Sequence, residues 1–506
     1  MNSKAVHTPF AMLADRMRHR VYFTGCLCAW IVLLLGCAPK KPEKKPSILY
    51  ILADQWRASA TGYAGDPNVR TPHLDQLAKQ SINFQNAVSV IPVCTPYRAS
   101  LMTGRYPTST GMFLNDLHLP LTEYGLGDVL ADRGYTTAYI GKWHLDGQGR
   151  HAYIPPERRR GFAYWKAAEC DHDYNQSHYY TGNSPEKQYW EGYDVYAQTA
   201  DAKAYIAGQL ENEKPFALFL SYGTPHFPHH TAPEELQQNY PPGEIILPAN
   251  VPESMGEQVR KEAQGYYAHC EALDQSIGDL LAYLDALGIR EETLIVFTSD
   301  HGEMLGSHGV RPKAKQVPLA ESARIPFLLH YPPLHGKSGR TVQTPITTPD
   351  IFPTLFGLLD LPIPDTYEGD DLSSVLTENS EIEGHAVLYM QLAPWGVAGP
   401  YGREYRAVKT AQYTYVRSLD GPWLLFNDQK DPLQLTNLIE EPAYEAIVSQ
   451  LDEKLEALLG KRGDAFHPAQ WYLDRWQLKP GAHGSIPYDK EGTVPPQSPQ
   501  LRKDAS

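Results

Sequence analysis

The chain has 506 residues, of which 42% are hydrophobic and 21% are charged, so it is long enough to form one large folded domain with a smaller one attached. Its formal net charge of -14 argues against nucleic acid as a partner, because nucleic-acid binding needs an excess of positive charge. An anionic substrate must therefore be held by a local basic pocket.

The first 36 residues have the pattern of an export signal. Basic residues precede an apolar run, Val21 to Leu35, which is short for a transmembrane anchor of about 20 residues. The run ends in Leu-Gly-Cys at Cys37, which resembles a bacterial lipobox and implies cleavage before Cys37 and lipidation of that residue. We expect residues 1–36 to be a lipoprotein signal peptide and residues 37–46 a polar tether, with the protein lipid-anchored in the bacterial cell envelope, periplasmic or at the outer-membrane surface.

The first segment of the folded domain is a continuous apolar run, Ser47 to Ala53, which predicts a buried parallel strand. Asp54 and Gln55 follow this strand directly, at the end where open α/β sheets bind ligands. The alternative for Asp54 is an N-cap of the next helix.

The stretch from Cys94 to Arg105 reads Cys-Thr-Pro-Tyr-Arg-Ala-Ser-Leu-Met-Thr-Gly-Arg. It follows an expected short strand over Ala87 to Val93 and opens a helix. The positive end of that helix, with Arg98 one turn on, would lower the pKa of the Cys94 thiol. From these residues alone, Cys94 is a nucleophile, part of an anion site, or an ordinary buried cysteine.

A third predicted strand, Thr136 to Ile140, leads into Lys142 and His144. In an extended segment these two side chains point to the same side. The following residues, 145 to 200, are rich in loops and aromatic side chains and predict the wall of a sugar pocket, the alternative being a solvated insertion with some buried tyrosines.

The strand predicted over Pro215 to Tyr222 ends at a cluster of three histidines, His226, His229 and His230. Neither thiolates nor the spacing of a helical zinc site accompany them. They therefore indicate a pocket at a strand end more than a zinc centre.

A second acidic strand end follows a long amphipathic helix predicted over Gln258 to Leu287. The strand over Glu292 to Ser299 ends at Asp300 and His301. Two carboxylates, Asp54 and Asp300, meeting at one sheet edge would repel each other, and a hard cation would offset that repulsion.

Beyond residue 377 the pattern changes to alternating strands over Arg403 to Val416 and Pro422 to Asn427, followed by a helix over Glu441 to Leu459. We expect a catalytic domain over 47–376, a C-terminal subdomain over 377–480 and a flexible tail over 481–506. Cys170 and Cys270 either pair as a disulfide or remain buried thiols.

The Cys-X-Pro-X-Arg string at Cys94, with the Ser-Leu-Met-Thr-Gly-Arg that follows, closely resembles the signature of the type I sulfatases, the formylglycine-dependent family within the alkaline phosphatase superfamily. Four further strings occur in the family order: Asp-Gln at 54–55, Gly-Lys-Trp-His at 141–144, Pro-His at 225–226 and Asp-His at 300–301. The resemblance covers roughly residues 46 to 460. It implies an α/β fold with a large mixed, mostly parallel sheet flanked by helices and a smaller C-terminal subdomain made of an antiparallel sheet and a helix.

The resemblance also implies the cofactors. Cys94 would be converted to formylglycine (3-oxoalanine) by a formylglycine-generating maturase. One calcium ion would be held by Asp54, Gln55, Asp300 and His301 together with the modified residue 94. The family more often has Asp where Gln55 stands and Asn where His301 stands, so His301 either binds the metal or hydrogen-bonds the nucleophile.

The family's catalytic roles carry over to residues of matching motifs. Arg98, Lys142 and Lys315 would hold the sulfate, and His144 would take a proton from the formylglycine hydrate. His226 or Lys315 would protonate the departing oxygen. Lys313 is the other candidate for the last lysine, and Lys315 is chosen because its distance from the Arg-Ile-Pro string at 324–326 is the usual one.

The implied activity is hydrolysis of sulfate esters on a sulfated polysaccharide or oligosaccharide, either algal, such as ulvan or carrageenan, or a glycosaminoglycan. The implied partners are this carbohydrate, the maturase and a membrane reached through the lipid anchor. The alternatives are a phosphoesterase or phosphonate hydrolase of the same superfamily, or a glycan-binding lipoprotein without catalysis.

Overall fold

The computed structural model describes Met1 and residues 45–502, apart from 213, 396–398, 483 and 489–495. The expected signal peptide, Cys37 and nearly all of the tether lie outside the described residues. The segment Pro46–Ser506 forms one compact unit, in which the two expected domains share a core. Among the helices that are described, none has the length and apolarity needed to cross a membrane.

A ten-stranded mixed sheet forms the centre of the described chain, in the order β11-β2-β10-β9-β1-β8-β4-β5-β6-β7. Its middle is parallel: β1 (Ser47–Asp54) pairs with β8 (Phe216–Pro225) and β9 (Thr293–Ser299), and β4 (Thr136–Lys142) pairs with β8 and with β5 (Tyr164–Ala168). Antiparallel pairs, β10 with β9 and β6 with β5, end the parallel region. The outer strands are β2 (Ile82–Phe84), β6 (His178–Thr181), β7 (Gln188–Tyr189), β10 (Phe327–His330) and β11 (Arg340–Val342).

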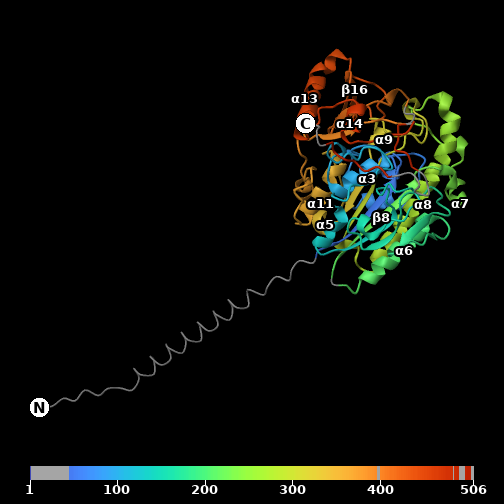
Figure 1. The fold of residues 1–506 in the computed structure, drawn as a ribbon, viewed down its shortest axis with the longest axis vertical. Coiled ribbons are helices and arrows are strands. Elements are labelled where there is room, and N and C mark those ends of the chain that lie inside the picture. Colours follow the sequence, from blue (N-terminus) through green and yellow to red (C-terminus); the bar gives the residue numbers. More distant parts are fainter. Residues whose placement is uncertain (2–44, 213, 396–398, 483, 489–495, 503–506) are drawn as a thin grey trace. The chain divides into compact units, whose positions relative to one another are not determined.

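Strand β1 is buried on both faces because its alternate side chains enter two different cores. Tyr50 and its neighbours two residues away pack with α3, α5 and α11, whereas Ile51 and its neighbours pack with α2, α6 and α8. Figure 1 shows α6 and α8 on one side of the strands around β8, and α5 and α11 on the other. These helices are α2 (Pro72–Ala78), α3 (Cys94–Thr103), α5 (Leu126–Asp132), α6 (Asp194–Gln209), α8 (Gly256–Ala286) and α11 (Ile351–Leu358). The expected large mixed, mostly parallel sheet flanked by helices is confirmed.

The C-terminal part adds an antiparallel four-stranded sheet, as expected, and its first strand, β13, precedes the two ranges in which strands were predicted. Helix α13 (Glu445–Lys461) buries Leu451, Leu455 and Leu459 in the same core as the main sheet. The strands are β13 (Val387–Gln391), β14 (Tyr405–Lys409), β15 (Tyr413–Ser418) and β16 (Gly421–Asn427). The remaining short helices are α4 (Pro107–Thr110), α7 (Glu234–Gln237), α9 (Ala320–Ala323), α10 (Pro332–His335), α12 (Ser373–Thr377) and α14 (Ala469–Arg475).

One local expectation is wrong. The strand expected over Ala87 to Val93 stops as β3 (Ala87–Val88), which pairs with β12 (Ile346–Thr347). The chain then bends, because the next two N–H groups do not bond to a neighbouring strand. That of Ser89 donates to the carbonyl of Ala323 at the end of a short helix, and that of Val90 donates to the hydroxyl of Thr348. The described part of the tail packs onto the domain: Ile486 is buried, and the carbonyl of Gln497 accepts a hydrogen bond from the backbone of His118.

Candidate active site

The candidate residues converge at the carboxyl end of the central sheet. Asp54 is the last residue of β1 and Lys142 is the last residue of β4. Asp300 directly follows β9, and His226 directly follows β8. Because the carboxyl ends of parallel strands meet at one edge, residues that are far apart in sequence form a single site there.

Cys94 is the first residue of α3, in which every side chain is buried. Pro96 lies in the first turn of this helix. Proline has no backbone N–H, but N–H groups in the first turn have no partner within the helix, so no hydrogen bond is lost. The Thr95 N–H donates to the side-chain oxygen of Asn115 at 2.9 Å. The helix ends at Gly104, whose φ of 65° is left-handed. The buried N-terminus of α3 therefore holds residue 94 at the sheet edge.

The side chain at 94 is surrounded by charged and polar groups. Its Sγ lies 3.3 Å from Lys315 Nζ, 3.3 Å from His301 Nε2, 3.8 Å from Asp54 Oδ1 and 3.9 Å from Lys142 Nζ. Burial and Asp54 would raise the pKa of the Cys94 thiol, but Lys142, Lys315 and His301 outweigh them and hold it well below its ordinary value. The pocket therefore favours an anion, or a side chain bearing developing negative charge, at this position.

Arg98 joins the two buried carboxylates. Its Nε and Nη2 donate to Asp300 Oδ2 at 3.2 and 3.0 Å, and Nη2 also donates to Asp54 Oδ2 at 3.1 Å. Its Nη1 donates to the Lys142 carbonyl at 2.9 Å and to Ser221 Oγ at 2.8 Å. These bonds use all five N–H groups of the guanidinium. Arg98 thus orients the carboxylates, and it has no N–H left for the sulfate that it was expected to hold.

The carboxylates fit a hard divalent cation. Ligand atoms of Asp54, Cys94, Asp300 and His301 all lie within 4.8 Å of one another, and all four residues are buried. Burial, and then the Asp54 carboxylate, raises the pKa of Asp300 above its ordinary value. A bound cation would relieve this repulsion, and carboxylate oxygens are the ligands that Ca²⁺ and Mg²⁺ prefer.

Gln55 lies beside this group. Its backbone N–H donates to Asp300 Oδ1 at 3.0 Å, and its side-chain oxygen accepts from Lys315 Nζ at 3.0 Å. The side-chain nitrogen bonds to Glu303, which fixes the direction of the amide oxygen. That oxygen therefore points to the same side as Lys315, and its second lone pair could bind a cation.

The structure separates the two candidate lysines. Lys315 reaches Cys94, whereas Lys313 Nζ pairs with Glu262 at 2.8 Å. His229 bonds to the same Glu262 through Nδ1 at 2.9 Å and does not join the residues around Cys94. His230 is exposed.

His144 lies next to the nucleophile position and bonds to a residue without a predicted role. Its Nε2 is 3.1 Å from Asp116 Oδ1. Burial would lower the pKa of the His144 imidazole, but Cys170, Asp116 and Cys94 together raise it to about 9. Lys142, two residues earlier, places Nζ 2.6 Å from Asp54 Oδ2.

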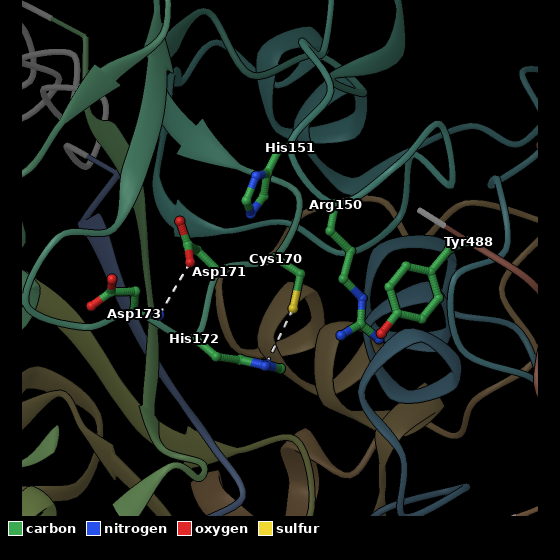
Figure 2. A pocket seen from close by; sticks show the side chains of 7 residues that line it. All are labelled: Arg150, His151, Cys170, Asp171, His172, Asp173 and Tyr488. Atoms are coloured by element: carbon green, nitrogen blue, oxygen red, sulfur yellow. Dashed lines mark hydrogen bonds between the residues drawn. The ribbon is translucent and has the colours of Figure 1, made fainter. Parts of the chain in front are cut away.

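A cavity of about 230 Å³ adjoins this site, and Figure 2 shows the side chains that line it. The His172 ring stacks on the His226 ring with centroids 4.4 Å apart, and Tyr488 from the tail lies 3.8 Å from the Arg150 guanidinium. The lining side chains are those of Arg150, His151, Cys170, Asp171, His172, Asp173 and Tyr488. Most come from the segment in which a sugar-pocket wall was expected.

Cys170 and Cys270 are unpaired thiols.

Sequence reasoning missed Asp116, Ser221 and Tyr488. None lies in a string that marks the site: Asp116 sits in a loop, Ser221 is inside β8, and Tyr488 is in the tail. Glu303 stands in the Asp-His-Gly-Glu string at 300–303, and its contacts with Gln55 could have been suspected from that position.

Comparison with known proteins agrees with this geometry. A family model described as Sulfatase matches residues 46–361, and one described as N-sulphoglucosamine sulphohydrolase, C-terminal, matches residues 306–461. An ulvan-active sulfatase of Formosa agariphila is 50% identical over 446 residues, 88% of this chain and 87% of the relative. An endo-4-O-sulfatase of Bacteroides thetaiotaomicron is 29% identical over 503 residues, covering 87% of this chain and 97% of the relative.

A solved structure from Bacteroides thetaiotaomicron, described in connection with the metabolism of multiple glycosaminoglycans, superposes with a TM-score of 0.74 at 28% identity, covering 85% of this chain and 98% of that one. The second family model, over residues 306–461, includes the C-terminal sheet. The chain belongs to the sulfatase family and is a sulfuric ester hydrolase.

Proposed function

We propose that the protein removes sulfate from a sulfated polysaccharide or oligosaccharide, with residue 94 as the nucleophile after its conversion to formylglycine. One observation carries the proposal: the side chain at 94 lies within 4 Å of two lysine amines, a histidine and a buried carboxylate. Such a pocket can bind a sulfate group and stabilise negative charge as it develops on the attacking oxygen.

Two groups absent from the unmodified chain complete the proposed chemistry. Asp54, Gln55, Asp300 and His301 would hold calcium, which when bound lowers the pKa of a neighbouring hydroxyl and neutralises sulfate oxygens. Formylglycine, in its hydrated form, supplies a hydroxyl nucleophile together with a second hydroxyl. Its formation requires a maturase as a partner.

The chain's own residues then divide the work. Arg98 fixes the two carboxylates, while Lys142 and Lys315 supply the positive charge nearest residue 94. His144 exchanges a proton with the side chain at 94. Because Arg98 has no spare N–H, the two lysines are the cationic side chains that bind the sulfate oxygens.

The geometry favours Lys315 over His226 as the proton donor to the leaving oxygen. His226 Nδ1 is 2.7 Å from the Phe227 carbonyl, which can only accept, so Nδ1 carries the hydrogen. Burial, with Lys315 and His172, lowers the pKa of His226 well below its ordinary value and keeps the ring neutral. Its Nε2 is therefore an acceptor that orients a sugar hydroxyl, and the ammonium of Lys315 donates the proton.

A carbohydrate substrate is supported by the adjoining cavity and by the relatives. The cavity offers histidine, arginine and aspartate side chains, which match sugar hydroxyls because these both donate and accept hydrogen bonds. The relatives include an ulvan-active sulfatase and an endo-4-O-sulfatase. The lipobox-like string at Cys37 supports attachment to the cell envelope, where large extracellular glycans are within reach.

The test has two parts. Intact-mass and peptide mass spectrometry of active enzyme should show formylglycine at 94, and an unaltered thiol in fully active protein would refute the nucleophile. Sulfate release should then be measured on ulvan, carrageenan and glycosaminoglycan oligosaccharides, with paired aryl sulfate and aryl phosphate as references. Faster phosphate than sulfate turnover would favour a phosphoesterase, and binding without sulfate release would favour a glycan-binding protein.

The assignment of the proton donor has its own test. A sugar alkoxide is a poor leaving group and needs a proton, whereas 4-nitrophenolate does not. Lys315→Ala should therefore lower kcat for oligosaccharide much more than kcat for 4-nitrophenyl sulfate. His226→Ala removes a contact to a sugar hydroxyl, so it should raise the KM for oligosaccharide and change the turnover of 4-nitrophenyl sulfate little. A fall in kcat confined to oligosaccharide in His226→Ala, with equal losses on both substrates in Lys315→Ala, would assign the proton to His226.

A further inference from the structure

Asp116 is a buried carboxylate with two bonding partners near the nucleophile position. Arg150 donates from Nε to Oδ1 at 2.9 Å and from Nη2 to Oδ2 at 3.0 Å. His144 Nε2 lies 3.1 Å from the same Oδ1. Burial would raise the pKa of Asp116, but Arg150 and His144 lower it well below its ordinary value, so the group is a carboxylate.

This contact fixes the orientation of the His144 ring. A carboxylate oxygen only accepts hydrogen bonds, so Nε2 of His144 carries the hydrogen and points toward Asp116. Nδ1 is on the opposite side of the ring, and within the described residues it is buried without a partner. The Cys94 side chain helps to raise the pKa of His144, so it lies near the ring, and Nδ1 is the ring nitrogen that is not already bonded.

The loop that carries Asp116 is tied to the same turn as residue 94. The Asp116 N–H donates to Thr95 Oγ1 at 3.3 Å, and this hydroxyl donates to the His144 carbonyl at 2.9 Å. Asn115 accepts from the Thr95 backbone. The nucleophile turn, the histidine and the carboxylate are thereby held as one unit, with Asp116 at a left-handed φ of 65°.

We propose that Asp116 is a positioning residue for the sulfatase reaction: its carboxylate holds His144 in the one ring orientation that turns Nδ1 toward residue 94. The inference rests on the proposed function, since it takes His144 to exchange a proton with that residue. Arg150 compensates the buried charge, and because Arg150 also lines the cavity, it links the sugar pocket to the proton-transfer residue. No family string includes Asp116.

The test is a double-mutant cycle on matured enzyme with 4-nitrophenyl sulfate. His144→Ala should lower kcat by about 100-fold or more, the range for loss of an acid–base group, and Asp116→Ala by about 10- to 100-fold with KM little changed. The double variant should match His144→Ala within about twofold, because Asp116 acts only through His144. A further 10-fold loss in the double variant would overturn the proposal, as would unchanged kcat in Asp116→Ala.

Controls separate positioning from general destabilisation. Asp464→Ala removes another buried carboxylate paired with an arginine, Arg406, in the C-terminal part of the chain, and its effect should add to that of His144→Ala. Asp116→Asn keeps one acceptor oxygen and should retain more activity than Asp116→Ala. Equal losses in the two Asp116 variants would point to the ion pair with Arg150 and against positioning.

A measurement without turnover distinguishes failure of this inference from failure of the proposed function. Histidine-ring NMR should show a protected Nε2–H, assigned to His144 by its loss in His144→Ala, and Asp116→Ala should remove it. If the wild type releases no sulfate, the proposed function fails, but this signal still tests the contact. A protected Nε2–H that survives Asp116→Ala would refute the positioning role.

Discussion

Two buried arginines of this protein bond to carboxylates, but their surroundings differ. In the C-terminal subdomain, Arg406 meets the single carboxylate of Asp464 at 2.6 Å, and Tyr472 and two backbone carbonyls take its other N–H groups. At the sheet edge, Arg98 meets two carboxylates at once. All N–H groups of both guanidiniums form hydrogen bonds. The hydrogen bonding of the arginine therefore does not distinguish a structural site from a catalytic one.

The difference lies in the charges around each arginine. Arg406 and Asp464 balance each other inside a closed core that includes the rings of Phe466 and Tyr472. Around Arg98, two repelling carboxylates and two lysines lie within reach of Cys94, and a cavity adjoins them. An ion pair whose two charges balance each other has a structural role. A cluster whose charges are balanced only when a further ligand binds is suited to binding and catalysis.

The sharpest way to break this comparison is Cys94→Ala. We expect sulfate release to fall by about 10⁵-fold or more, because the nucleophile is lost, while the melting temperature stays close to that of the wild type. Ion chromatography of released sulfate and thermal unfolding measure the two effects. Substantial residual turnover would show that residue 94 is not the nucleophile.

Removal of divalent cations should affect the carboxylate cluster around Arg98 and leave the Arg406–Asp464 pair unchanged. Treatment with a calcium chelator should lower activity by about 100-fold or more, because one electrostatic stabiliser is removed, and added Ca²⁺ should restore it. Saturating Ca²⁺ at 100 times its Kd should also stabilise the fold by about 2.7 kcal/mol. Asp464→Ala should respond to the chelator as the wild type does, and full activity in the chelator would contradict the metal site.

Arg406→Ala should give the opposite result from Cys94→Ala. It leaves Asp464 buried without its cation, which should destabilise the fold by about 3–5 kcal/mol. The kcat of the folded fraction should stay within about twofold of the wild type. Denaturant unfolding and active-site-normalised kinetics test both parts, and a large fall in kcat would show that the two clusters are coupled.

A smaller effect is expected from the buried imidazole of His269, which is neutral and hydrogen-bonded and should make the stability of the fold depend on pH. Tyr193 lies 2.6 Å from His269 Nδ1, and burial lowers the pKa of His269 to about 3. The unfolded state binds a proton below about pH 6.5, whereas the folded state does not, so stability is lost as the pH falls from 6.5 toward 3. At pH 5 this loss is about 2 kcal/mol for this residue. His269→Gln should flatten the decrease of melting temperature between pH 7 and 5, and an unchanged slope would contradict this assignment.

Residues with a local signal were predictable. Asp54, Lys142, His226 and Asp300 follow or end buried apolar runs, and such runs end at the ligand-binding edge of a parallel sheet. Cys94 was predictable from its string and from the helix that it opens. The individual strands followed from hydrophobic patterns, and their assembly into a large mixed sheet with a C-terminal antiparallel one was implied by the family resemblance.

Other features depended on tertiary structure. The bend after Val88 and the packing of Tyr488 on Arg150 result from partners more than 200 residues away in the chain. Asp116 approaches His144 only because two loops are held against the N-terminus of α3.

The sequence by itself therefore determined the strands, the residues at their ends and the family, because hydrophobic periodicity and short strings are local properties. Only the tertiary structure decided that Arg98 has no N–H left for sulfate, that Lys315 rather than Lys313 reaches residue 94, and that Asp116 bonds to His144. Those outcomes depend on side-chain directions and on loops brought together across the sheet edge, and no local pattern encodes them.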